Sequence, residues 1–111
     1  MIQAGPAKKL TVYVDETEKV HGKPVYEVLM DICFRKKLSG MSVFRGVAGY
    51  GSHRVFHTAK LLELSTNLPV KIEIVDSEST INDVLPEITA AVGKGLIEIS
   101  DTIVIAVSGN K

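Results

Sequence analysis

Apolar and polar residues alternate along several short stretches of the chain, and this period of two is typical of strands with one buried face. The pattern is clearest at residues 9–14 and 70–75. It also predicts a strand at 41–47 and a last strand region at 96–107, which is interrupted near Ser100-Asp101. These four segments predict the principal strands of a sheet.

A different spacing marks the first predicted helix. Pro24 suits the first helical position, and Gly40 predicts the end of the helical region. Arg35, Lys36 and Lys37 fall in the predicted last turn, where positive charge suits the helix dipole. Apolar residues follow the spacing i, i+3, i+4, i+7 and i+8, at Val25, Val28, Leu29, Ile32 and Cys33.

The second predicted helix follows a polar stretch at 76–80. Ser79 or Thr80 is the predicted cap, and Thr80 with Asp83 resembles a capping box. Pro86 lies inside the pattern, and because the apolar stripe keeps its phase across it, we expect a kink without a break. The stripe consists of Ile81, Val84, Leu85, Ile88 and Val92.

The predicted elements follow the order strand, helix, strand, strand, helix, strand. With right-handed crossovers this order gives an antiparallel sheet with both helices on one face, the α+β ferredoxin-like plan. A further strand-like run lies at 60–64, and a loop that we expect to be flexible lies at about 46–58. The 111 residues suit a single domain with its core at about 9–107.

Composition narrows the classes of function. The formal net charge is zero, which counts against a generic nucleic-acid-binding protein. One cysteine, Cys33, cannot form an internal disulfide. No apolar run approaches the roughly 20 residues of a membrane span. The first residues lack the hydrophobic core of a signal peptide, so we expect a cytoplasmic protein.

Candidate chemistry gathers in the glycine-punctuated segment that follows the second predicted strand. Its glycines allow backbone N–H groups to approach a ligand closely, and its cations favour an anion there. No helical pattern follows, so the segment is not a dinucleotide-binding fingerprint, and a simple turn remains the alternative. The candidate ligand-binding residues are Arg45, Gly46, Gly49, Tyr50, Gly51, His53, Arg54 and His57.

Two other classes of site have less support. His53 and His57 are four residues apart, a spacing that can hold a metal on a helix, but the segment is loop-like and no third ligand is evident. Asp15, Glu16 and Glu18 lack the ligand spacing of a calcium loop and are interpreted as a solvated acidic loop. The sequence contains no recognisable pair of a nucleophile and a general base, so we expect that the protein is not an enzyme.

Several blocks of the sequence, spread over residues 9–107, agree in order and spacing with a known family. The blocks lie at 21–27, 43–51, 57–60, 64–65, 68–69 and 72–76. In these blocks the chain resembles a family of small PII-like proteins of unknown function, which are related to the nitrogen-regulatory PII signalling proteins. The resemblance implies a homotrimer with adenine nucleotides bound in the clefts between subunits.

The resemblance also assigns residues to those clefts. In PII proteins the segments after the second strand and after the second helix line the cleft, which implies that Lys94 assists from a neighbouring subunit. The phosphate-gripping loop of PII proteins is reduced here, because Gly95 is followed at once by the strand-like run from Leu96. We therefore expect a smaller anion, such as a mono- or diphosphate nucleotide. AMP, ADP and ATP are the ligands to test, and no covalent cofactor is expected.

The resulting expectation is a regulatory protein that binds an adenine nucleotide or a similar small anion. Its segment 46–58 is expected to become ordered by the ligand and to contact a protein partner, such as a membrane transporter or an enzyme. The alternative is a metal-ion-binding trimer similar to the copper-tolerance (CutA) family, which rests on His53, His57 and the acidic loop. No nucleic-acid partner is expected.

Overall fold

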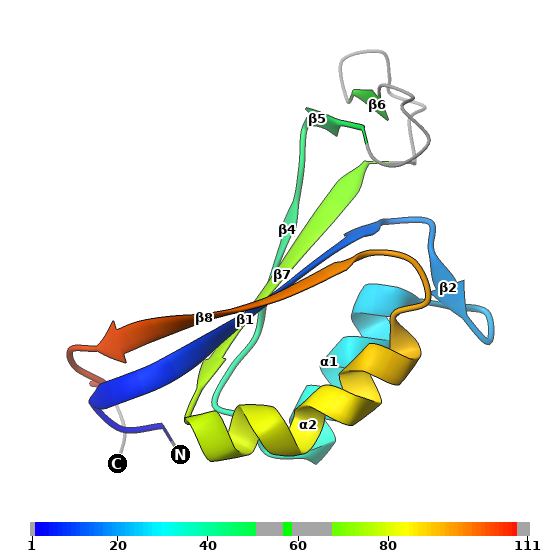
Figure 1. Ribbon diagram of the computed structural model, residues 1–111. Helices are drawn as coiled ribbons and strands as arrows, with labels where there is room; N and C mark the ends of the chain where they lie inside the picture. Colours follow the sequence, from blue (N-terminus) through cyan, green and yellow to red (C-terminus); the bar gives the residue numbers. More distant parts are fainter. Residues whose placement is uncertain (1, 51–56, 59–67, 109–111) are drawn as a thin grey trace.

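A four-stranded antiparallel sheet carries two helices on one face, which confirms the predicted ferredoxin-like plan (Figure 1). The computed structural model describes residues 2–50, 57–58 and 68–108. Within these residues the strand order is β4-β7-β1-β8, and each neighbouring pair is antiparallel. The principal elements are β1 (Gly5–Asp15), α1 (Val25–Arg35), β4 (Ser42–Arg45), β7 (Pro69–Asp76), α2 (Glu78–Ala91) and β8 (Leu96–Val104).

Two small ribbons lie outside the main sheet. Strand β2 (Lys19–Val20) pairs with β3 (Lys23–Pro24) immediately before α1. Strand β5 (Ala48–Gly49) pairs with β6 (His57–Thr58) beyond the end of β4 (Figure 1). Two described parts of the segment after β4 therefore lie antiparallel to each other.

Two sequence predictions fall on the parts of the chain that are not described. The strand-like run at 60–64 lies wholly outside the described residues. Nearly half of the loop at 46–58 does so as well, because residues 51–56 are not described.

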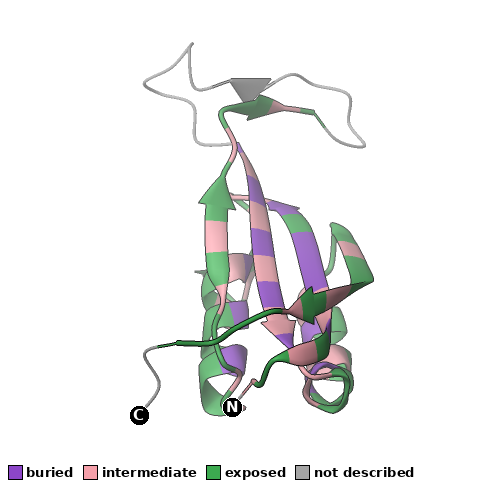
Figure 2. Cartoon of the chain, turned by 90° about the vertical axis from the view of Figure 1, so that its left-hand side faces the viewer, coloured by how far each residue is buried: buried purple, intermediate pink, exposed green. Residues whose placement is uncertain are grey.

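The core lies between the sheet and the helices, as the alternating patterns predict. Along β1, Leu10, Val12 and Val14 are buried, and along β7 every second residue from Val70 to Asp76 is buried (Figure 2). The buried helical residues that cover them are Val25, Leu29, Ile32 and Cys33 from α1, and Ile81, Val84 and Ile88 from α2. This removal of apolar surface from water is the main favourable contribution to folding.

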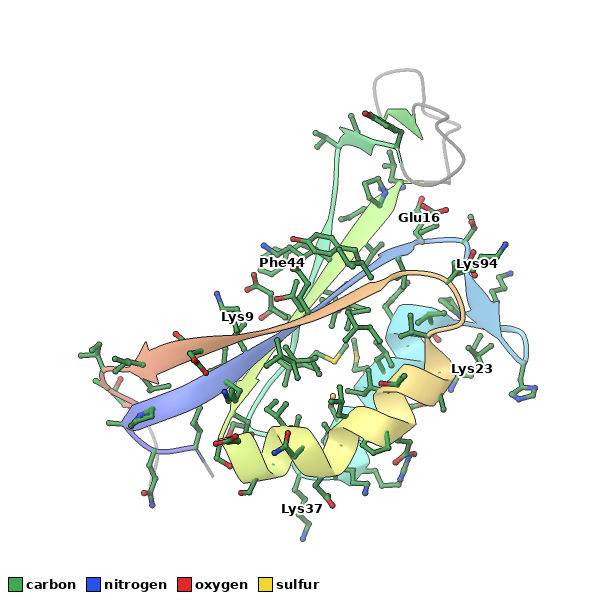
Figure 3. The ribbon with its side chains drawn as sticks, viewed as in Figure 1. Lys9, Glu16, Lys23, Lys37, Phe44 and Lys94 are labelled. Carbon is green, nitrogen blue, oxygen red and sulfur yellow. The ribbon has the colours of Figure 1, made fainter. Side chains whose placement is uncertain are left out.

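The opposite face of the sheet, which we call the open face, has no described helix over it (Figure 1). Tyr13, Phe44 and Leu96 lie on this face and are 39%, 50% and 53% exposed. Lys9 and Phe44 both point away from the helices (Figure 3). Large apolar side chains that stay exposed on one face are typical of a surface that contacts another protein.

The last strand differs from its prediction. The interruption expected near Ser100 and Asp101 is wrong, because β8 runs without a break. Ser100 pairs with Lys9 and Asp101 pairs with Lys8 in the ladder between β1 and β8. An ion pair between Lys8 and Asp101 compensates for the low strand propensity of the aspartate.

The boundaries of α1 also correct the sequence analysis. Pro24 is the N-cap residue and not the first helical residue, and Gly40 does not end the helix. The left-handed residue is Lys37, with φ of +62°. The backbone N–H of Leu38 donates to the carbonyl of Cys33 at 3.0 Å, so the helix closes with a Schellman-type turn.

The N-terminal cap of α2 is Ser77, so the prediction of Ser79 or Thr80 is wrong. The Ser77 hydroxyl oxygen accepts a hydrogen bond from the backbone N–H of Thr80 at 3.3 Å. The helix continues through Pro86 without a break, as expected from the uninterrupted apolar stripe. No described helix is long and apolar enough to cross a membrane.

The loop between α2 and β8 depends on one glycine. Gly95 has φ of +157°, and a Cβ atom there would lie 2.5 Å from the carbonyl oxygen of Tyr13 and 2.9 Å from Cγ1 of Val14. The first of these atoms belongs to the backbone of β1, which pairs with a strand on each side, so it cannot move without disturbing the sheet. Gly95 therefore allows the loop to rest directly on the end of β1.

We predict that Gly95→Ala lowers the free energy of unfolding by about 2 kcal/mol, the usual scale for overpacking against fixed atoms. Urea denaturation measures the change. Gly93→Ala is the matched control, because no atom lies within 4 Å of a Cβ built at Gly93. The control should stay within about 0.5 kcal/mol of the wild type. Equal losses in the two variants would contradict this explanation.

Candidate functional site

One end of the sheet brings together segments that are distant in the sequence. Asp15 at the end of β1 pairs with Pro69 at the start of β7, and Arg45 at the end of β4 pairs with Val70. Strand β8 begins at this same end, where Leu96 pairs with Tyr13. The loops that carry Glu16, Gly46 to Tyr50 and Lys94 therefore all leave the sheet at one end, which we call the loop end.

An ion pair between Arg45 and Glu16 is the main polar contact at the loop end. Nε of Arg45 donates to Oε1 of Glu16 at 2.7 Å, and the terminal nitrogen Nη2 donates to Oε2 at 3.1 Å. This bidentate geometry is the strong form of an arginine–carboxylate contact. The hydrogen bond from Arg45 is the main cause that lowers the pKa of Glu16 below its ordinary value of 4.5.

Glu16 also connects this ion pair to the start of β7. Its backbone N–H donates to the carbonyl oxygen of Leu68 at 2.9 Å, and its Oε2 accepts from the backbone N–H of Leu68 at 3.4 Å. Leu68 is buried and Arg45 ends β4, so one acidic residue holds the two described ends of the segment between these strands.

Gly46 and Gly49 have a structural reason to be glycines. A Cβ atom at Gly46 would lie 2.8 Å from Cγ of Pro69, and one at Gly49 would lie 3.0 Å from the same atom. The backbone N–H of Gly46 donates to the carbonyl oxygen of Pro69 at 2.7 Å, so this N–H is not available to an anion. The turn interpretation therefore explains these two glycines, and their role in ligand binding stays a prediction.

A surface depression of about 260 Å³ lies beside Arg45. The ammonium nitrogen of Lys71 lies 6.0 Å from the centre of the Phe44 ring and 2.9 Å from Oε2 of Glu73. The hydrogen bond to Glu73 is the main cause that raises the pKa of Lys71. The residues that line the depression are Tyr13, Phe44, Arg45, Gly46, Pro69, Val70 and Lys71.

The other predicted site residues are only partly described by the structure. Tyr50 and Lys94 are exposed, and Lys94 forms no ion pair with a described residue. Gly51, His53 and Arg54 lie outside the described residues. His57 lies in β6 opposite Gly49, and only its backbone is described.

No described group of three or more histidine, cysteine or acidic side chains is arranged to hold a metal ion. His53 and the side chain of His57 lie outside the described part of the structure, so the metal hypothesis stays a prediction. Cys33 is buried among apolar residues, and its burial raises the pKa of the thiol to about 11. This thiol is therefore poorly suited to nucleophilic chemistry.

The sequence analysis missed Phe44, Lys71 and Glu16 as parts of this site. Alternation along 70–75 already placed Lys71 on the face opposite the core, which was the available signal. Nothing in the sequence paired Glu16 with Arg45, because their contact depends on how three strands are ordered and aligned in the sheet.

Solved structures of other proteins share this fold. CPII, a nitrogen regulatory PII-like protein from Thiomonas intermedia K12, was solved bound to ADP, AMP and bicarbonate. It matches with a TM-score of 0.66 and 20% identity over 94% of this chain and 92% of that chain. A PII-like signaling protein from Thermus thermophilus matches with a TM-score of 0.66 and 13% identity over 94% of each chain. The fold is therefore PII-like.

The family follows from the sequence comparisons. The model of the DUF190 family, described as "Uncharacterized ACR", matches residues 7–104, and the chain belongs to this family. A UPF0166 protein of Aquifex aeolicus (strain VF5) is 39% identical over 98 residues, which cover 88% of this chain and 92% of that protein. A UPF0166 protein of Methanocaldococcus jannaschii is 42% identical over 96 residues, which cover 86% and 88%. The predicted resemblance to a PII-like family is thus confirmed.

We predict that Glu16→Gln lowers the free energy of unfolding by about 0.5–1 kcal/mol at neutral pH, the upper range for an ion pair near the surface. Because the pKa of Glu16 is lowered in the folded state, this stabilisation is present above pH 4.5. It is lost as the pH falls through the folded pKa, so the difference between wild type and variant should close in acid. Urea denaturation at several pH values measures it.

Glu18→Gln is the control for that experiment. Glu18 lies on the same loop and forms no ion pair with a described residue. Its replacement should change stability by less than about 0.5 kcal/mol at any pH. A gap between wild type and Glu16→Gln that persists unchanged in acid would show that the ion pair is not its cause.

Proposed function

We propose that this chain is a PII-like regulatory protein that binds an adenine nucleotide at the loop end of its sheet. The observation that carries the proposal is the placement of Arg45, beside an aromatic-lined depression, in a fold shared with a protein solved with ADP and AMP. An adenine nucleotide combines an anionic group, which an arginine binds, with a flat ring, which Tyr13 and Phe44 can contact.

Arg45 keeps donors for such a ligand although it is paired. A guanidinium group has five N–H donors, and Glu16 occupies two of them. The Arg45 side chain is 57% exposed, whereas that of Glu16 is 16% exposed. The carboxylate thus holds the guanidinium in a fixed orientation, while the rest of it is accessible to an anion.

A trimer is the second part of this proposal. Arg45 ends one edge strand, β4, and Lys94 precedes the other edge strand, β8. Three strand spacings, or about 14 Å, separate these strands. A ring in which the β4 edge of one copy faces the β8 edge of the next would place Arg45 and Lys94 of different copies in one cleft. The exposed side chains of Phe44 on β4 and Leu96 on β8 supply apolar surface at both of these edges.

The third part of the proposal assigns the regulatory role to the segment between β4 and β7. Its two described ends are held at Arg45 and Leu68, next to the proposed ligand, so binding there acts directly on the segment that we expect to contact a protein partner. On the basis of the sequence, we also propose a cytoplasmic location and a transporter or an enzyme as the partner.

Isothermal titration calorimetry with AMP, ADP and ATP tests nucleotide binding. We expect heat of binding with at least one of the three, and a weaker interaction in Arg45→Ala by about 1.5–3 kcal/mol, the usual value of a hydrogen bond to a charged group. Arg35→Ala is the matched control, because Arg35 is another exposed arginine paired with a glutamate, Glu87, but it lies on α1. No heat and no thermal shift with any nucleotide would contradict the proposed function.

The trimer is tested by measuring the mass of the protein in solution by light scattering. One chain has a mass of 12.0 kDa, so three chains give about 36 kDa. Replacement of the exposed Phe44 by glutamate should shift this mass toward that of one chain, because it adds charge to the open face. A wild-type mass of one chain at all concentrations would exclude the trimer.

A further inference from the structure

Both cations that line the depression are already paired with carboxylates. Arg45 binds Glu16 through two hydrogen bonds, and Lys71 binds Glu73 at 2.9 Å. The formal charges of these four side chains sum to zero. The exposed guanidinium of Arg45 beside the depression therefore offers N–H donors to an anion, while these four side chains contribute no surplus of the positive charge that a polyphosphate needs.

Glu16, the carboxylate partner of Arg45, is held in place by further contacts. Its backbone N–H is bonded to the carbonyl oxygen of Leu68 at 2.9 Å, and its side chain is less exposed than that of Arg45. It occupies the edge of the guanidinium formed by Nε and one terminal nitrogen. The second edge, which includes the other terminal nitrogen, is bonded to no described residue, and such an edge matches two oxygens of one phosphate group.

We propose that Glu16 is a specificity-determining residue that makes this site prefer a nucleotide with a single phosphate group over a triphosphate. The proposal rests on the function put forward for the chain and deepens it. Glu16 presents one free guanidinium edge to one phosphate, and its negative charge repels each further phosphate group. The same carboxylate would thus orient the arginine and limit the charge of the ligand.

Calorimetry of AMP and ATP binding to wild type, Glu16→Gln and Glu18→Gln tests this selectivity. We expect wild type and Glu18→Gln to bind AMP at least as tightly as ATP. In Glu16→Gln the affinity for ATP should rise about three- to tenfold, and that for AMP should rise less, because only ATP carries the additional charges that Glu16 repels. A variant that merely loosened the site would weaken both ligands, so the ratio of the two affinities separates the explanations.

Glu16→Asp shows whether the preference for AMP over ATP depends on the charge of this side chain or on its length. It keeps the carboxylate, so it should retain the preference of the wild type even where its affinities are lower. It also keeps the proposal testable in case Glu16→Gln does not fold. An unchanged ratio of ATP to AMP affinity in Glu16→Gln, or a ratio in Glu16→Asp that matches Glu16→Gln, would overturn the proposal.

A second measurement separates this proposal from nucleotide binding itself. The Nε–H signal of Arg45 in nuclear magnetic resonance spectra, assigned with Arg45→Lys, is followed while inorganic phosphate is added. We expect a larger shift in Glu16→Gln than in the wild type at equal phosphate concentration. If no nucleotide binds the wild type but this difference is seen, the proposed function and the nucleotide selectivity both fail, and only an effect of Glu16 on anion binding at Arg45 is left. Equal shifts would overturn the role of Glu16.

Discussion

The backbone pairing of β1 with two neighbours is the interaction on which the other parts of the structure depend. This strand pairs with β7 from Lys8 to Asp15 and with β8 from Gly5 to Tyr13. Its side chains Leu10 and Val12 are completely buried beneath the helices. A shift of β1 would therefore break two ladders and open the core at once, and it would also move Glu16, which follows directly after the strand.

The candidate site is a consequence of this pairing. In an antiparallel sheet the ends of β1 and β4 meet the starts of β7 and β8, so loops far apart in the sequence leave the sheet together. The contact between Arg45 and Glu16 spans 29 residues of sequence and arises only because β7 lies between their strands. At the loop end, Arg45 and Lys71 are each paired with a glutamate. This pairing distinguishes the site from a cluster of unpaired cations.

The sequence predicted the elements well where side-chain burial alone decides them, as in the alternation at 70–75 and the two apolar helix stripes. The sequence-based predictions were wrong where a contact between strands or at the end of a helix determines the structure. Asp101 interrupts a strand pattern when it is considered alone, but opposite Lys8 it fits the ladder. The arginine at 45 was recognised as a candidate from its type, whereas its pairing with Glu16 needed the strand order, which no local pattern contains.

Gly95 has a consequence for how the segments that carry Lys94 and Arg45 are supported. The loop that carries Lys94 rests at Gly95 on the carbonyl of Tyr13, which belongs to β1, one of the two interior strands. Arg45 instead ends an edge strand, and the turn after it rests on the ring of Pro69. The loop that carries Lys94 is thus supported by the backbone of β1, and Arg45 is oriented by Glu16, the residue that follows β1 directly. A substitution that displaced the end of β1 would therefore move the supports of both cations together.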